Sequence, residues 1–298
     1  MVKISIVIVN YNTNEYLSRC IKSIYKTDIL KDQIQVVIVD NNSYDSSLKI
    51  TKEYITKNKL DVEVISNSEN LGFSKAVNLG LNKCYGHYIC ILNPDTYIEK
   101  DCLSELEKYM DNNLDIGAIT PKVINSNGRL QISCKRSLPT IRNSIFKILG
   151  LDKVFSGNKF FSSYNLLYLD ENDISEVEVI SGAFMFLRKS VFEKVGYFDE
   201  RFYLYGEDID YCHRIKKESF SIIYYPLVRV IHYKGKSAES HPFEAIYHFH
   251  SSMIKYYNKY QDQYFGWSAL KFLIFISVII KKYLSYFYLI IKNIFKLK

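Results

Sequence analysis

The sequence predicts an α/β fold in which a mostly parallel central sheet is flanked by helices. Segments rich in β-branched and apolar residues alternate with segments of helical composition through the first hundred residues, an order typical of parallel strands joined by right-handed crossovers. Several of these strand segments end directly in Asn or Asp. Because open α/β sheets bind ligands at the carboxyl ends of their strands, these residues predict a binding site at that edge.

The first three strand segments follow this pattern in order. Ile4–Asn10 is a β-branched run, and the apolar residues after it keep helical spacing. Gln35–Val39 predicts a second strand that ends at Asp40, and Val62–Ile65 predicts a third, which precedes a helix reaching Leu81. We therefore expect three strand–helix units in the first third of the chain.

The fourth strand segment brings a carboxylate to the same edge. The stretch Tyr88–Ile98 begins with mostly apolar residues and then reaches Asn93, Pro94 and Asp95. Proline has no N–H to donate to a β-ladder, so the strand is expected to stop there and leave Asp95 at the edge of the sheet. Two roles fit Asp95: a solvated turn residue, or a ligand of a divalent cation that bridges a diphosphate.

Together, the strand ends suggest a nucleotide site. Asn10 and Asn12 follow the first strand, Asp40 the second, and Asn93 and Asp95 the fourth. An aspartate after the second strand can accept a hydrogen bond from a ribose hydroxyl or from the ring N–H of a pyrimidine. No Gly-x-Gly-x-x-Gly motif follows the first strand, which disfavours a dinucleotide dehydrogenase.

The second half of the chain is less regular. Ile116–Ile124 predicts a further strand, broken by Pro121. Residues 125–175 are weakly periodic, and both a functional loop, such as an acceptor-side lid, and a small helical subdomain fit them. This stretch contains a cluster of basic residues, namely Arg129, Lys135, Arg136 and Arg142.

Two later segments carry candidate site residues. Val177–Leu187 is an apolar strand interrupted by Gly182 and Ala183, whose small side chains permit close approach of a donor or acceptor ligand. Further on, Glu207 and Asp208 begin a predicted helix. Acids in a first turn complement the helix dipole, and one of them can alternatively point into a cleft as a general base.

His232 lies just past another predicted strand, beside a basic loop. It can complete a metal site, and the loop can bind phosphates, although a lone histidine is more often structural. Val230 stands where the first glycine of a P-loop would be, so the loop is not a P-loop. The loop comprises Lys234, Gly235, Lys236 and Ser237. The remaining histidines are interpreted as structural or surface residues: His87, His213, His241, His248 and His250.

The C-terminal tail is apolar and basic. Residues 265–298 contain six lysines and no acidic residue, and the segments Phe272–Ile280 and Tyr283–Ile291 are almost wholly apolar or aromatic. A membrane-spanning helix would place Lys281 and Lys282 at the bilayer centre, at a cost of about 2.5 to 3.5 kcal/mol each. Most of the lysines fall within about 100° of a helical wheel, which favours an interfacial helix on an anionic membrane surface. The alternative is a helix packed on the protein or on another subunit.

Composition restricts the remaining choices. With 298 residues and 48% hydrophobic content, the chain can form one large domain, alone or with an appendage. The formal charge of +7 indicates an anionic partner, but no aromatic and basic platform of an RNA-binding module is evident, so nucleic acid is not expected. The six cysteines include no Cys-x-x-Cys pair, which indicates a reducing cytosol. The N-terminus is interpreted as a first strand and not as a signal peptide.

Taken in order, these segments resemble glycosyltransferase family 2 enzymes of the Rossmann-like GT-A fold, and most closely their bacterial rhamnosyltransferase-like branch. The resemblance runs from the N-terminus to about residue 240. It implies a GT-A domain at 1–240, with a nucleotide-binding half at 1–115 and an acceptor or catalytic half at 116–240, then an amphipathic, membrane-associating helical segment at 241–298. The matching segments are SIVIVNYN, VVIVDNNSYDSS, ENLGFSKAVNLG, ILNPDTYI, NGRLQIS, SGAFMFLRKSVFEKVGYFDERFYLYGEDIDYCHRI and the loop after His232.

The resemblance implies roles for the residues at matching positions. Asp40 matches the aspartate that reads a pyrimidine base. Asn93-Pro94-Asp95 stands where the family has its DxD motif, with asparagine in place of the first aspartate, so Asp95 is implied as the ligand of Mg²⁺ or Mn²⁺. His232 matches a second metal ligand, and the loop from Lys234 to Ser237 matches the diphosphate loop. The implied nucleotide contacts are completed by Asn10, Asn12, Asn42, Gly72, Asn78 and Asn93.

The implied activity is an inverting, metal-dependent sugar transfer with Asp208 as the base and Glu207 as its competitor for that role. Rhamnose from dTDP-rhamnose is the expected donor, and a lipid-linked saccharide at the inner face of a bacterial membrane is the expected acceptor. A UDP-sugar with galactose, galactofuranose or N-acetylglucosamine is the alternative donor. A non-catalytic nucleotide-sugar-binding or membrane scaffold protein is the alternative of another class, and a homo-oligomer is left open.

Overall fold

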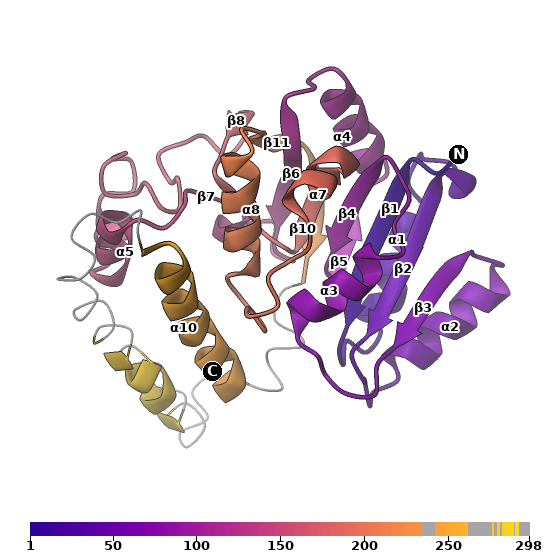
Figure 1. Ribbon diagram of the computed structural model, residues 1–298, viewed down its shortest axis with the longest axis horizontal. Helices are drawn as coiled ribbons and strands as arrows, with labels where there is room; N and C mark the ends of the chain where they lie inside the picture. Colours follow the sequence, from indigo (N-terminus) through magenta and orange to yellow (C-terminus); the bar gives the residue numbers. More distant parts are fainter. Residues whose placement is uncertain (234–241, 262–275, 277–278, 281, 289, 292–298) are drawn as a thin grey trace.

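The structure is a computed structural model that describes residues 1–233, 242–261, 276, 279–280, 282–288 and 290–291; its central layer is a nine-stranded mixed sheet (Figure 1). The strand order is β3-β2-β1-β4-β10-β6-β11-β5, with β8 paired to β11. In chain order these strands are β1 (Ile4–Asn10), β2 (Ile34–Asp40), β3 (Val62–Ser66), β4 (Tyr88–Leu92), β5 (Thr96–Ile98), β6 (Ile116–Ile124), β8 (Ser175–Glu176), β10 (Phe184–Arg188) and β11 (Ser221–His232).

The sheet is mostly parallel, as the alternating pattern predicts. β1 to β4, β6 and β11 share one direction, and β10 lies antiparallel between β4 and β6. All seven residues of β1 and all five of β4 are buried, which accounts for their nearly continuous apolar sequences. Because β6, β10 and β11 join the strands of the first 115 residues in one sheet, the two expected halves share a single core.

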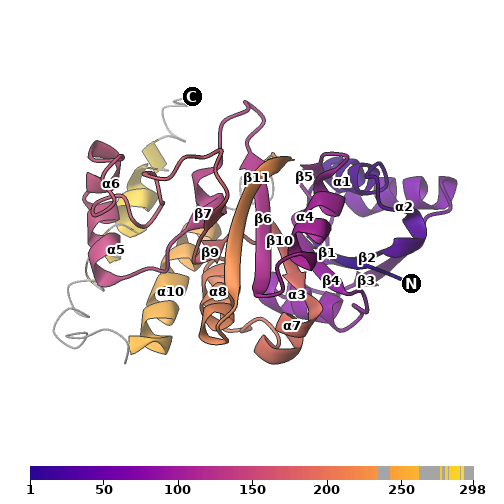
Figure 2. The same ribbon diagram turned by 90° about the horizontal axis from the view of Figure 1, so that it is seen from above.

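Helices cover both faces of this sheet. Figure 2 shows α3, α7 and α8 on one face and α1 and α4 on the other. The helices are α1 (Tyr16–Ile24), α2 (Ser47–Lys57), α3 (Phe73–Leu81), α4 (Cys102–Asp111), α5 (Ile141–Ile148), α6 (Leu151–Val154), α7 (Lys189–Val195), α8 (Glu207–Lys217) and α10 (Pro242–Lys259). Short 3₁₀ turns lie at Lys31–Gln33 and Ile132–Cys134, and β7 (Lys135–Arg136) pairs with β9 (Val179–Ile180) in a second, two-stranded sheet.

Two details of the sheet differ from the sequence-based expectation. Pro121 does not break β6, because β11 shifts its register beside it: Tyr225 pairs with Pro121, and Arg229 pairs with the next residue. The extra residues of β11 form a bulge that tolerates the missing N–H. The stretch after Asp95 does not simply end the fourth strand either, since it forms β5, antiparallel to the end of β11.

The helix α10 packs against the same body of the protein. Tyr256, Tyr257 and Tyr260 form a buried cluster with Phe202, and the Tyr260 hydroxyl donates a hydrogen bond to Asp210 of α8 at 2.7 Å. Within the described part of the chain, no helix has the length and apolar character needed to cross a membrane.

Candidate active site

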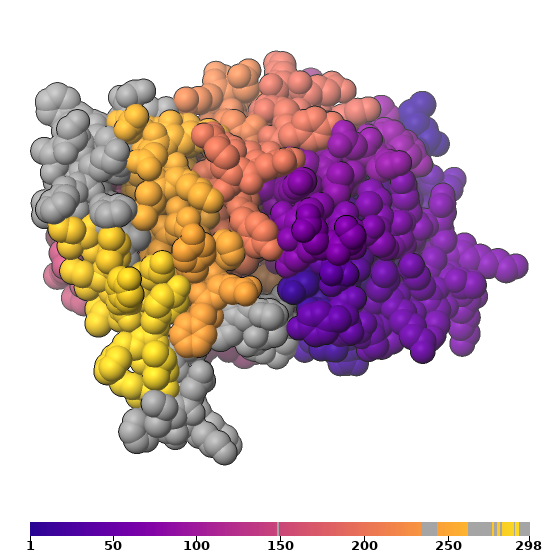
Figure 3. Space-filling model, turned by 60° about the horizontal axis from the view of Figure 1, so that its bottom comes forward, coloured from indigo at the N-terminus to yellow at the C-terminus, as the bar shows by residue number. Residues whose placement is uncertain are grey.

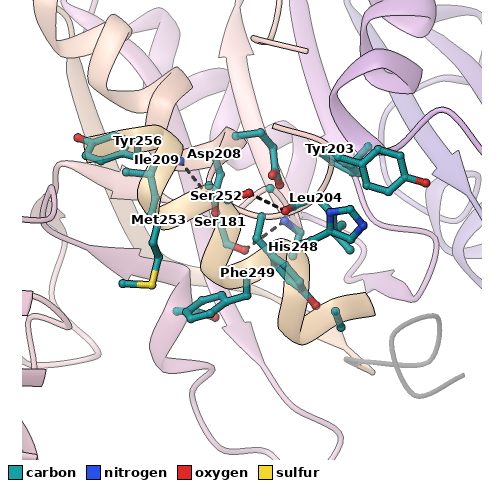
Figure 4. Close-up of a pocket in the computed structure, with 18 of the residues that line it drawn as sticks. Ser181, Tyr203, Leu204, Asp208, Ile209, His248, Phe249, Ser252, Met253 and Tyr256 are labelled. Atoms are coloured by element: carbon teal, nitrogen blue, oxygen red, sulfur yellow. Dashed lines mark hydrogen bonds between the residues drawn. The ribbon is translucent and has the colours of Figure 1, made fainter. Parts of the chain in front are cut away.

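The carboxyl ends of β1 and β4 face the first turn of α8 across a cavity of about 630 Å³. α10 forms a further wall, where His248 stacks on Tyr203 with ring centroids 4.4 Å apart and Ser252 donates a hydrogen bond to the Leu204 carbonyl at 3.0 Å (Figure 4). The cavity gathers residues from distant parts of the sequence that were predicted to form one site. These are Gly72, Asn93, Asp95, Gly182, Ala183, Glu207, Asp208 and His232.

Asp95 and His232 meet at one wall of the cavity. Nε2 of His232 lies 3.0 Å from Oδ1 of Asp95, and both side chains are buried. The pairing of strands in the sheet brings these two side chains together. β11 carries His232 at its end and pairs there with β5, which follows Asp95 directly. The backbone N–H of Tyr233 donates to the Asp95 carbonyl at 2.9 Å and fixes this register.

This pair fits a divalent cation. Nδ1 of His232 lies 2.8 Å from the Gln131 side-chain oxygen, which can only accept, so Nδ1 donates this bond and Nε2 is the ring nitrogen that faces Asp95. The Asn93 amide also approaches Nε2, at 3.3 Å. An imidazole nitrogen and a carboxylate oxygen 3.0 Å apart can ligate one cation together. No group of three or more His, Cys, Asp or Glu side chains that could hold a metal occurs among the described residues, so phosphate and water oxygens would complete such a site.

The opposite wall carries two carboxyl groups with different surroundings. Asp208 accepts a hydrogen bond from Arg136 at 2.5 Å, and both side chains are largely buried. Glu207 is buried, and its Oε2 finds no hydrogen-bond partner in the described structure. Burial raises the pKa of Glu207 to about 8, and the adjacent Asp208 charge adds to the rise. Asp208 is therefore paired with an arginine, while the raised pKa of Glu207 favours its protonated form at neutral pH.

The residues predicted at the first two strand ends form a buried network beside the cavity. Nδ2 of Asn10 donates to Oδ1 of Asp40 at 2.7 Å, and the backbone N–H of Ser43 donates to Oδ2 of Asp40 at 3.1 Å. Neither Asn10 nor Asp40 is among the lining residues, but Asn41, the next residue along, is. The network fixes the loop after β2 at the edge of the cavity.

Three other predicted nucleotide contacts do not line the cavity. Asn12 and Asn42 both have positive φ, and Asn12 accepts a hydrogen bond from the backbone of Tyr44, while Asn42 is exposed. Asn78 is buried and exchanges hydrogen bonds of 2.9 Å with the backbone of Phe198. These bonds join α3 to the loop before α8. They give Asn78 a structural role, and its contact with a nucleotide stays a prediction.

The two predicted glycines lie close to the acidic wall. Gly72 has φ of +80°, and a Cβ there would come within 2.5 Å of the Tyr203 ring. Gly182 borders the Asp208 side chain: a Cβ added at Gly182 would lie 3.9 Å from the Cβ of Asp208. The predicted diphosphate loop, Lys234, Gly235, Lys236 and Ser237, lies outside the described residues.

Sequence reasoning missed several residues of the cavity. Arg136 belongs to the basic cluster noted in the weakly periodic stretch, but its partner, Asp208, lies 72 residues further on. His248 and the rest of α10 were interpreted as structural or as part of the tail, and they line the cavity. The aromatic residues at the end of α10 and just after it, Tyr256, Tyr257 and Tyr260, are buried, and their spacing is the signal that indicates packing on the domain.

The sheet order and the site at its edge place the protein in the GT-A class of α/β folds. A solved structure of this fold, the mannosyltransferase PcManGT from Pyrobaculum calidifontis in complex with GDP-Man and Mn²⁺, aligns with a TM-score of 0.59 at 16% identity, over 86% of this chain and 64% of that one. The family model for glycosyl transferase family 2 matches residues 5–196. The chain therefore belongs to glycosyltransferase family 2.

Two curated relatives extend the similarity beyond the matched segment. The Low-salt glycan biosynthesis hexosyltransferase Agl10 of Haloferax volcanii is 29% identical over 233 residues, which are 77% of this chain and 66% of that protein. The N-acetylglucosaminyl-diphospho-decaprenol L-rhamnosyltransferase of Mycobacterium tuberculosis is 25% identical over 273 residues, 88% of this chain and 85% of the other. The chain thus spans about two thirds of the first relative's length and most of the second's.

Proposed function

We propose that this protein transfers a sugar from a nucleoside diphosphate sugar to an acceptor hydroxyl, with inversion at the anomeric carbon. The observation that carries the proposal is that one cavity holds the Asp95–His232 pair on one wall and the Glu207–Asp208 pair on the other. The first pair suits a cation and a diphosphate, and the second suits a proton acceptor. Family membership supports the same reaction class.

The roles proposed for the binding residues follow from their positions. Asp40, held by Asn10 and Ser43, would recognise the base, and the cavity edge at Gly72 and Asn93 would hold the rest of the nucleotide. Asp95 and His232 would hold Mg²⁺ or Mn²⁺, which when bound supplies positive charge to the departing diphosphate. Gln131 orients His232 for this task through its hydrogen bond to Nδ1.

We assign the base to Asp208 and a supporting role to Glu207. The Asp208 carboxylate borders the cavity and pairs with Arg136, which orients it to accept the proton of an acceptor hydroxyl. Glu207, with its pKa raised to about 8 mainly by burial, holds a proton at neutral pH and can donate a hydrogen bond to a sugar or phosphate oxygen. Gly182 and Ala183 leave room for the sugar between these acids and the metal pair.

The proposal also names a donor, dTDP-rhamnose, and an acceptor, a lipid-linked saccharide. The L-rhamnosyltransferase of M. tuberculosis aligns with 88% of this chain, which supports rhamnose as the transferred sugar, with dTDP-rhamnose as the donor that the sequence resemblance implies. The acceptor of that relative is an N-acetylglucosaminyl-diphospho-decaprenol, which supports a lipid-linked saccharide acceptor for this chain, in cell-surface glycan synthesis. The basic, apolar tail supports a peripheral location on the inner face of the membrane.

Calorimetric titration with UDP and with dTDP, each with Mg²⁺, Mn²⁺ or EDTA, tests the proposal. We expect metal-dependent binding with a preference for dTDP. Asp95→Asn should lose the metal-dependent part of the affinity, whereas Asp208→Asn should keep nucleotide binding and lose turnover by about 10²-fold to 10⁴-fold. Normal turnover by Asp208→Asn would contradict its role as the base. If the folded protein binds neither nucleotide, the alternative of a non-catalytic scaffold protein would be favoured.

A further inference from the structure

We propose that the outer face of α5, α6 and the turn after them is a membrane-contact surface of the domain itself, which seats on an anionic lipid bilayer. We call this surface the α5–α6 face. Apart from Lys147, which also lines the catalytic cavity, its residues lie outside that cavity, and the face is separate from the C-terminal tail. Its exposed apolar residues are Ile145, Leu149, Val154, Phe155 and Phe160, and its basic residues are Arg142, Lys147, Lys153 and Lys159.

The apolar part of this face is unusually exposed for large side chains. Leu149 is 65% exposed and Val154 73% exposed, and all residues from 153 to 160 are exposed. Phe155 and Phe160 pack against Phe161, one tilted and one edge-on, with ring centroids 4.9 and 5.2 Å apart. They form an ordered aromatic patch that presents one side to the solvent, a feature typical of interaction surfaces.

The charge of the α5–α6 face identifies the partner. All four charged side chains exposed between residues 137 and 169 are basic. The one acid in this range, Asp152, is buried and accepts a hydrogen bond from Asn165 at 3.1 Å. Of the exposed acidic residues that follow this range, Glu171 pairs with Lys122 of β6 at 2.9 Å. Apolar and aromatic side chains surrounded by lysines suit the boundary between anionic head groups and acyl chains.

The position of this face in the molecule supports the same partner. Figures 1 and 2 both place α5 at the end of the molecule that carries the helical residues 282–288, opposite α2. In Figure 3 the yellow C-terminal residues lie beside α10 at that same end. Tyr286 contacts Phe243 of α10, at 5.5 Å between ring centroids, and Leu284 and Phe287 are exposed. The two apolar surfaces could therefore contact one bilayer together.

Membrane contact here has a consequence for the cavity. Ser144 and Lys147 of α5 line its far end, near Tyr164. If the α5–α6 face rests among lipid head groups, the cavity opens at the depth where the diphosphate of a lipid-linked saccharide lies. This consequence rests on the proposed function, but membrane contact itself does not.

Sedimentation of the full chain with vesicles of phosphatidylglycerol and phosphatidylcholine tests the proposal. Lys153→Glu combined with Lys159→Glu should weaken binding at least tenfold. The matched control, Lys52→Glu with Lys57→Glu, makes the same charge change on α2 at the opposite end and should bind as the unchanged protein does. Val154→Ser with Phe155→Ser should also weaken binding, while thermal melting shows that each variant is folded.

The outcomes separate the competing explanations. Equal weakening by the two charge-changing pairs would mean that net charge alone drives binding, and no weakening by either would mean that the tail alone holds the membrane. Both results overturn the proposal. If the unchanged protein fails to bind the vesicles at all, the proposed membrane location also fails, while nucleotide binding by calorimetry still tests sugar transfer separately.

Discussion

Glu207 has surroundings that favour the neutral form of its carboxyl group. Its pKa rises from 4.5 to about 8 because the side chain is buried, with a further contribution from Asp208. A carboxyl group whose pKa is raised by folding binds its proton more tightly in the folded state. Its contribution to stability is therefore full below about pH 4.5 and is lost as the pH rises through about 8.

Glu207→Gln removes this titration and keeps the shape of the side chain. We expect the stability of the unchanged protein, relative to the variant, to fall between pH 5 and pH 9, so that the variant is the more stable of the two at the alkaline end. Urea unfolding at several pH values measures both free energies of unfolding. Parallel pH profiles for the two proteins would show that Glu207 does not carry the raised pKa.

Gln131 acts on the proposed metal site through His232. Its side-chain oxygen accepts the hydrogen bond from Nδ1 and so directs Nε2 toward Asp95. Gln131→Leu removes this bond and should lower the affinity for Mn²⁺, measured with nucleotide present, by about 10-fold to 100-fold. Gln131→Glu, which keeps an acceptor at the same place, should restore much of it. Equal Mn²⁺ affinity in all three proteins would show that Gln131 does not support the metal site.

At the scale of elements, the connection between β3 and α3 depends on a glycine that meets another loop. The Asn41 side chain donates to the Gly72 carbonyl at 3.0 Å, and the Phe73 N–H donates to the Tyr203 carbonyl at 2.7 Å. The positive φ of Gly72 and the nearby Tyr203 ring leave no room for a Cβ. This contact joins the nucleotide side of the cavity to the loop that precedes the two acids.

Gly72→Ala should therefore destabilise the protein by about 2 kcal/mol or more and weaken nucleotide binding as the loop shifts. Gly128, with a similar φ of +79° and nothing within 4 Å of an added Cβ, provides the matched control. Gly128→Ala should lose only the free energy that the positive φ costs an alanine. The difference between the two variants in the free energy of unfolding therefore measures the cost of the clash with Tyr203. Equal losses in the two variants would show that this contact contributes nothing.

The sequence predicts the strand ends better than it predicts the contacts between distant loops. β1 and β4 are continuous apolar runs that end in polar residues, so local composition is enough to locate Asn93 and Asp95. The pairing of Arg136 with Asp208 depends on the small β7–β9 sheet. Two-residue strands leave no periodic signal, so the sequence alone does not indicate that pair.

At the scale of the whole molecule, the domain boundary expected at residue 240 divides elements that pack together. Asp210 of α8 is fully buried and contacts Arg214 of its own helix. It also contacts Lys259 at 2.5 Å and Tyr260 at 2.7 Å, both beyond that boundary. Tyr256 bonds to His213 in the same region. The segment beyond residue 240 thus supplies one wall of the cavity and two of the three partners of this buried carboxylate.

A chain ending at residue 240 should therefore be much less stable than one ending at residue 261. The shorter chain loses the aromatic cluster around Phe202 and leaves Asp210 with one partner, and breaking a buried ion pair costs about 3 to 5 kcal/mol. The longer chain keeps both and lacks only the apolar tail, so it should melt close to the full chain and bind nucleotide with the same affinity. Thermal melting and calorimetry compare the three proteins. Equal stability of the two shortened chains would show that α10 belongs with the tail, as the sequence suggested, because its contacts with α8 would then contribute nothing to the fold.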